Sequence, residues 1–227
     1  MERTDLLRAI AERHAVRRYT DTPVPAAVRA ALGQTIEAAN AASGLRIQAV
    51  YDEPSAFGGR RSTYGQFRGV ANYLSFVGPS QPGLPELAGY WGELVVLHAQ
   101  LLGLNTCWVI LTYDRAKSAA TVELGEEEVL VATLGYGETP GKPHKAKPVE
   151  RLGQVTGGGP WPDWFRSGVE AVALAPSAMN QQKYTFTLTG DTVRAKPGFG
   201  MHVKIDMGIA KRHFEIGAGD GPWHWAE

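Results

Sequence analysis

A stretch rich in glycine, proline and lysine, residues 137–162, interrupts this chain of 227 residues between a long first part and a short second part. It includes GETPGKPHKAKP and TGGGPWP, where glycine and proline recur too often for a helix or a central strand to continue. We therefore interpret it as a connector between two halves, residues 1–150 and 160–227, of a single domain. A domain of this length can bury a substantial core.

Apolar periodicity predicts helices and strands on both sides of the connector. Helices are expected over residues 5–14, with Thr4 as N-cap, then from Pro25, and over 85–102, 164–175 and 205–216. Strands are expected over residues 45–51, 70–77, 105–113, 129–136, 184–188 and 192–195. No regular strand–helix–strand alternation is present, so the predicted class is α+β. Each half repeats the order helix, strand, long helix, which predicts two pseudo-repeated halves.

Charge and cysteine content exclude several classes of function. The chain has 23 basic and 23 acidic residues, so no net charge draws it to nucleic acid or to an anionic membrane. The start, MERTDLLRAIAERH, lacks the apolar run of a secretory signal, and a cytoplasmic location is expected. The single cysteine, Cys107, excludes an internal disulfide, and the six histidines lack a metal-binding spacing, so no metal is expected. Redox chemistry in such a chain needs a cofactor.

Two basic segments are candidates for binding an anion. Arg13 and Arg17 in RHAVRRY are four residues apart, so they share a helix face if the first helix continues, or flank its end if it does not. The alternative is a basic helix end that complements the helix dipole. Lys145 and Lys147 point the same way if the connector is extended there, although solvated linker charges are the alternative.

The third candidate is the segment APSAMNQQ, which begins at Ala175 after a predicted helix. Its small and amide residues offer backbone N–H groups, a hydroxyl and amides in a compact turn that suits the edge of a planar heterocycle. An ordinary helix-stop loop is the alternative.

Together these segments resemble the FMN-dependent nitroreductase family. RHAVRRY is similar to the family's opening R-x-S-x-R pattern, and APSAMNQQ to its A-P-S-x-x-N-x-Q-P loop. ELVVLHAQLLGLNTCWV is similar to a family helix ending in G-L-G-T-C-W, and VLVATLGYGETPGKPHKAKP to the family's closing strand and basic tail. Asp206, Gly208, Ile209, Ala210, His213 and Phe214 also have counterparts in a single-chain branch of thermophile-type nitroreductases.

The resemblance implies a pseudo-dimer. Ordinary members are homodimers that bind FMN at the subunit interface, with the arginine motif and the P-S-x-x-N loop on different chains. Here the arginines occur in the first half and the loop in the second, while residues 40–44 replace the loop in the first half. The resemblance therefore implies one chain that imitates a dimer, acts as a monomer and binds one FMN.

The resemblance also assigns residues to FMN. It places Arg13, Ala15 and Arg17 at the phosphate, ribityl chain and pyrimidine edge, where a cation raises the flavin's reduction potential. Ala15 replaces the family's serine, and Gln182 stands where proline is usual. The remaining implied contacts are Lys145 and Lys147 at the phosphate, the backbone of Tyr64 and Gly65, and Pro176, Ser177, Ala178 and Asn180 along the ring.

The implied activity is electron transfer from NAD(P)H through FMN to a small acceptor such as a nitroaromatic or a quinone. A non-catalytic flavin-binding protein or pseudo-enzyme, and a scaffold that has lost FMN, are the alternatives. No catalytic residue is implied, because the flavin carries the chemistry. Cys107 and Trp108 are interpreted as buried strand residues, and His98 and His213 as hydrogen-bonded core histidines.

Overall fold

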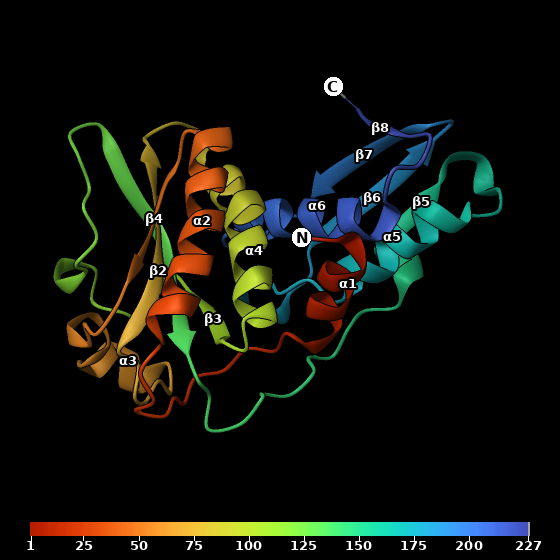
Figure 1. Ribbon diagram of the computed structural model, residues 1–227. Coiled ribbons are helices and arrows are strands. Elements are labelled where there is room, and N and C mark those ends of the chain that lie inside the picture. The colour runs from red at the N-terminus through yellow and green to blue at the C-terminus, as the bar shows by residue number, and fades with distance from the viewer. Residues whose placement is uncertain (227) are drawn as a thin grey trace. The chain divides into compact units, whose positions relative to one another are not determined.

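The computed structural model describes residues 1–226 and divides into two compact units (Figure 1). The central unit consists of Glu12–Leu84 and Leu94–Pro143. The terminal unit consists of Met1–Ala11, Pro85–Glu93 and the chain from His144 onward. Both units contain helices and a sheet, which confirms the α+β class, whereas the predicted halves of one domain, with their pseudo-repeat, stay a prediction.

The central unit contains an antiparallel sheet in the order β1-β2-β4-β3. Its strands are β1 (Arg46–Val50), β2 (Asn72–Pro79), β3 (Asn105–Val109) and β4 (Glu126–Gly135). Helix α2 (Ala26–Ser43) runs alongside this sheet in Figure 1 and contacts β1. Every residue of β2 before Pro79 is buried, including the polar residues Asn72 and Ser75.

A second layer of the central unit packs around aromatic side chains. It includes η1 (Ser55–Phe57), α3 (Arg60–Tyr64) and η2 (Arg115–Lys117). The Phe57 ring lies 5.9 Å from that of Tyr73 and 6.2 Å from that of Tyr113. Tyr113 also donates to the buried carboxylate of Glu128 at 2.8 Å. Burial is the main cause that raises the pKa of Tyr113, and the neighbouring Glu128 carboxylate raises it further. The central unit therefore has a core in which a buried carboxyl group is hydrogen-bonded.

The terminal unit contains helices and a second sheet. Its helices are α1 (Arg3–Glu12, of which Glu12 belongs to the central unit), the first part of α4 (Leu84–Leu101), α5 (Asp163–Ala173) and α6 (Val203–Ala218). Its strands, in spatial order, are β5 (Gly153–Val155), β6 (Tyr184–Thr189), β7 (Thr192–Pro197) and β8 (His224–Trp225). The ring of Phe214 lies 5.1 Å from Phe186, 5.2 Å from Trp223 and 5.4 Å from Trp225. The half-buried tryptophans of the tail therefore pack against this core.

The expected helices and strands are confirmed, with differences at their ends. The first helix begins at Arg3, so the prediction of Thr4 as its N-cap is wrong. The strand expected over residues 105–113 ends at Val109. The connector is not devoid of structure, because it contains η3 (Val149–Arg151), η4 (Thr156–Gly158) and β5, which pairs in parallel with β6. Short strands such as β5 and β8 take their conformation from the strand they pair with, and sequence periodicity does not reveal them.

Within residues 1–226, no helix combines the length and the apolar character that crossing a membrane requires.

Candidate functional site

The arginine segment is extended rather than helical. Helix α1 ends at Glu12, and the following chain pairs through its backbone with Thr106, Arg68 and Gly137 of the central unit. Val16 N–H donates to Thr106 O at 3.0 Å, and Arg68 N–H donates to Arg17 O at 2.9 Å. Of the two arrangements that the sequence left open, the structure therefore has the arginines beyond the helix end.

The side chains of this segment differ in burial. Arg13 is buried, whereas Ala15 and Arg17 are exposed. The Arg17 guanidinium lies 5.9 Å from the centre of the Phe67 ring. Burial raises the pKa of the Cys107 thiol, and the charges of Arg17 and Arg13 oppose this rise. Both arginines are therefore close enough to Cys107 for their fields to act on the same thiol.

Ion pairing of Arg17 and Lys145 bears on whether these side chains can bind an anion. In the part of the chain that the structure describes, no carboxylate lies within ion-pair distance of Arg17 or of Lys145. Both side chains are exposed. Each can therefore accept an anionic ligand without first breaking an ion pair.

Tyr64 and Gly65 lie in the same unit as the arginine segment. Tyr64 is the last residue of α3 and its side chain is exposed. Gly65 N–H donates to Arg61 O at 3.0 Å, so this amide is occupied within the helix end. Phe67, which lies beneath Arg17, follows Gly65 by two residues.

The segment after α5 forms a loop, residues 176–182, with unusual backbone conformations. Met179, Asn180 and Gln182 have φ angles of 50°, 54° and 43°. For residues other than glycine, each such conformation costs on the order of 1–3 kcal/mol and persists where surrounding contacts hold it. Met179 is among the most exposed apolar side chains, at 86%. The loop is therefore a strained segment that the rest of the terminal unit must hold in place.

The two predicted lysines lie against this loop. Lys147 Nζ donates to the carbonyls of Gln181 and Gln182, each at 2.8 Å. Asn180 Nδ2 and Gln182 Nε2 both donate to Lys145 O at 2.9 Å. The structure thus brings together all the predicted residues of the terminal unit. Lys147 Nζ and Asn180 Nδ2 already donate to backbone carbonyl groups of this unit.

Asp206 also contacts the loop, which the sequence did not reveal. Its carboxylate is buried in α6 and accepts from Ala178 N–H at 2.9 Å and from Gln181 Nε2 at 2.8 Å. Burial raises the pKa of Asp206, while the hydrogen bonds from Ala178 and Gln181 and the charge of His202 lower it. The available signal was the position of Asp206 at the start of the D-x-G-I-A segment.

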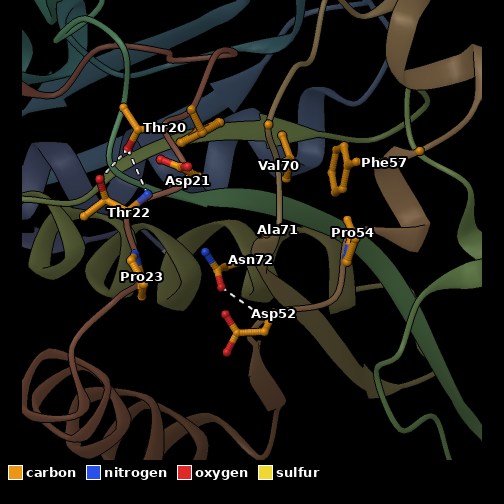
Figure 2. A pocket seen from close by; sticks show the side chains of 13 residues that line it. Thr20, Asp21, Thr22, Pro23, Asp52, Pro54, Phe57, Val70, Ala71 and Asn72 are labelled. Carbon is orange, nitrogen blue, oxygen red and sulfur yellow. Dashed lines mark hydrogen bonds between the residues drawn. The ribbon is translucent and has the colours of Figure 1, made fainter.

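A cleft of about 480 Å³ in the central unit contains none of the predicted cofactor residues (Figure 2). In Figure 2, Phe57 and Pro54 lie on one side of the cleft and Thr22 and Pro23 on the other. Asp52 and Asn72 lie between these sides, and Asp52 N–H donates to Asn72 Oδ1 at 3.0 Å. The Asp52 carboxylate is paired with Arg29 at 2.8 Å, and the charged residues that line the cleft are Asp21 and Asp52. A lining with acidic charge does not suit a phosphate.

The interpretations of Cys107 and His213 as buried residues are confirmed, whereas Trp108 and His98 are only half-buried. Cys107 is a buried residue of β3, and the half-buried Trp108 stacks on Phe76 at 4.7 Å. Thr35 Oγ1 lies 2.7 Å from His98 Nδ1. His213 Nε2 lies 2.9 Å from Glu93 Oε1, and its Nδ1 lies 2.9 Å from Ala171 O. Within residues 1–226, no group of three or more histidine, cysteine or acidic side chains is arranged to hold a metal ion.

Comparison with family models identifies the family. The model described as "Putative TM nitroreductase" matches residues 5–218. The chain belongs to this family. The match includes both segments that carry the predicted cofactor residues, the one around Arg17 and the loop that follows α5. No curated protein matches the sequence of this nitroreductase-family chain.

Solved structures share the nitroreductase fold. The structure of a nitroreductase from Thermotoga maritima, described as putative, has a TM-score of 0.66 at 20% identity over 95% of this chain and 84% of that chain. A Desulfovibrio desulfuricans nitroreductase in complex with FMN has a TM-score of 0.51 at 20% identity over 69% of this chain and 98% of that chain. A nitroreductase family protein from Streptococcus pneumoniae has a TM-score of 0.52 at 16% identity over 64% and 97%. At these identities, the likeness shows that the nitroreductase-family chain has their fold.

Proposed function

We propose that the protein is an FMN-dependent oxidoreductase that passes electrons from NAD(P)H to a small acceptor such as a nitroaromatic or a quinone. The observation that carries the proposal is the family match over residues 5–218, which includes every predicted cofactor residue. The Desulfovibrio desulfuricans structure of the same fold contains FMN, which supports the choice of cofactor.

The charges of the central unit fit a flavin phosphate or pyrimidine edge. Arg17 is exposed and has no carboxylate within ion-pair distance among residues 1–226, and Ala15, two residues earlier, is also exposed. A guanidinium offers paired N–H donors to a phosphate or a carbonyl oxygen, and its charge favours the reduced form of a flavin beside it. We assign Arg17, with Ala15 and the nearby Arg13, to one edge of FMN, and the backbone around Tyr64 and Gly65 to its ring.

The terminal unit supplies the second group of proposed contacts. Lys145 is an exposed cation for the phosphate, and Lys147 binds two carbonyl groups of the loop through its Nζ atom. Pro176, Ser177, Ala178 and Asn180 form the loop surface that we assign to the ring. The amide of Asn180 is bonded to Lys145 O, so the proposed contribution of Asn180 is the shape of the loop and its backbone.

FMN, when bound, supplies the electron-transfer chemistry, and NAD(P)H and the acceptor are proposed to use the same flavin in turn. This chain's residues bind and orient the flavin and set the charge around it. The buried Cys107, whose thiol has a raised pKa, takes no part in this mechanism.

Purified protein with added FMN tests the proposal. We expect FMN fluorescence to be quenched on binding, the visible flavin absorbance to bleach on addition of NADPH or NADH, and the absorbance to return when a nitroaromatic or a quinone is added. Binding without bleaching by either nucleotide would instead indicate a non-catalytic flavin-binding protein. Absence of FMN binding would contradict the proposed function.

A further inference from the structure

Asp206 occupies a position that the packing of two helices determines. A Cβ atom on Gly208 would lie 2.0 Å from Glu86 O, and one on Gly89 would lie 2.3 Å from Ile205 O. Helices α4 and α6 therefore cross in backbone contact on both sides of Asp206, and larger residues at either glycine would separate them. The buried Asp206 carboxylate is consequently held at a defined place in the terminal unit.

The carboxylate uses both oxygens to hold the 176–182 loop. Oδ1 accepts from Ala178 N–H at 2.9 Å, and Oδ2 accepts from Gln181 Nε2 at 2.8 Å. Gln181 Nε2 also donates to Met201 O at 2.7 Å. Because the same Gln181 nitrogen serves two acceptors, rotating the amide by 180° would place its oxygen against both of them.

These contacts explain how the strained backbone persists. Met179 and Asn180, both with positive φ, lie between the two residues that Asp206 binds. The carboxylate therefore closes a short segment at both ends, while Lys147 binds the carbonyls of Gln181 and Gln182 from the connector. A charged acceptor forms stronger hydrogen bonds than a neutral one, which favours this conformation over relaxed alternatives.

We propose that Asp206 is a positioning residue for FMN, whose carboxylate sets the 176–182 loop in the conformation that meets the flavin ring. The proposal rests on the proposed FMN binding and extends it to a residue that does not touch the flavin. It assigns to α6 a role in cofactor affinity, through the ends of the loop.

The Asp206→Asn variant tests the proposal because it keeps the shape of the side chain but places an N–H₂ group where an acceptor is needed. In flavin-free protein, we expect the amides of Ala178, Asn180, Gln181 and Gln182 to exchange hydrogen faster by on the order of tenfold. Amides of β6 should keep their protection. Equal loop protection in the variant and the wild type would overturn the proposal.

FMN titration supplies the second measurement. We expect Asp206→Asn to bind FMN on the order of tenfold more weakly, and its flavin absorbance spectrum at saturation to differ from that of the wild type. A changed spectrum at saturation reports the loop at the flavin, which a general loss of stability would not alter. Wild-type affinity together with an unchanged spectrum would overturn the proposal.

Two further variants serve as a control and as a second test of the same contact. Asp220→Asn removes an exposed carboxylate of the same unit and should change neither measurement. Gln181→Met retains the Asp206 carboxylate and its bond to Ala178 but removes the second contact. It should speed hydrogen exchange in the loop and weaken FMN binding, both by less than tenfold. This variant tests the proposal even if Asp206→Asn does not fold. If the wild type binds no FMN, the proposed function and the flavin part of this inference both fail, while hydrogen exchange still decides whether Asp206 holds the loop.

Discussion

Arg17 and Arg18 are adjacent and both exposed, but their surroundings differ. Arg17 lies over the Phe67 ring and near Cys107, whereas the backbone of Arg18 pairs with Arg68, and Arg18 O accepts from Glu138 N–H at 3.0 Å. In an extended chain, adjacent side chains point in opposite directions. The two arginines therefore provide a matched pair of variants.

Arg17→Ala is expected to weaken FMN binding by about 1–3 kcal/mol, the range for losing a charge-assisted hydrogen bond, and to lower the flavin's reduction potential. Arg18→Ala should have neither effect. Fluorescence titration with FMN and a redox titration of each variant measure the two quantities. Small and equal effects of the two substitutions would mean that the arginines form an ordinary basic segment.

The ionisation of Asp206 gives a pH dependence with a definite sign. Burial raises the pKa of Asp206 above its value in the unfolded chain. The unfolded state therefore loses this proton at a lower pH than the folded state, and the contribution of Asp206 to stability falls as pH rises from the unfolded pKa through the folded pKa.

Asparagine does not titrate, so the comparison with Asp206→Asn isolates this contribution. We compare the free energy of unfolding of the wild type with that of the variant and take the difference. This difference should decrease as the pH rises from about 4, near the unfolded pKa of aspartate, towards neutral pH. Urea unfolding of both proteins across this range measures the difference. A difference that rises with pH would contradict the predicted sign.

At the scale of elements, the close crossing of α4 and α6 fixes the position of Asp206, which holds the 176–182 loop. Gly208→Ala would place a Cβ atom 2.0 Å from Glu86 O and 2.7 Å from Tyr90 N, so the two helices would have to separate. We expect a loss of about 1–3 kcal/mol in the free energy of unfolding, and weaker FMN binding because Asp206 would move with α6. Urea unfolding and FMN titration check the two effects.

Gly33→Ala is the matched control for this prediction. Gly33 lies inside α2, and no atom lies within 4 Å of the Cβ that alanine would add. We expect this substitution to raise the free energy of unfolding by about 0.5–1 kcal/mol, because alanine restricts the unfolded chain and favours a helix. Similar losses in both variants would show that the contact with Glu86 O does not explain the effect.

At the scale of the whole molecule, the sequence predicts one FMN per chain, bound by a monomer. The arginine motif occurs once and the P-S-x-x-N loop once, so a single chain supplies each group of proposed contacts once. Flavin released by denaturation, divided by protein concentration, should approach one. A value near two would contradict the complementary division of the motifs.

Light scattering during dilution tests the predicted monomer. We expect a constant mass of one chain, about 24.5 kDa, with FMN retained. If FMN is lost together with the dissociation of a dimer, the site is completed by a second chain and the pseudo-dimer prediction is wrong.

The sequence by itself determined the class of the fold and the main elements of each unit. The stripe of apolar residues in α4 and the alternation of Tyr184, Phe186 and Leu188 in β6 are local patterns, and each element has the predicted type. The family was also readable from sequence, because its motifs are short segments whose residues are adjacent in the chain, and the family match confirms it. Local patterns predict what depends on neighbouring residues.

The tertiary structure decided features that depend on distant residues. Whether the first helix continued through Arg17 was settled by backbone pairing of that segment with Thr106 and Arg68, since both conformations were compatible with the sequence. The role proposed for Asp206 rests on its hydrogen bonds to Gln181 and Ala178, which precede it by 25 and 28 positions in the chain. A carboxylate in an amphipathic helix looks like a solvated charge in the sequence, and only the folded chain shows that it is buried and which donors it meets.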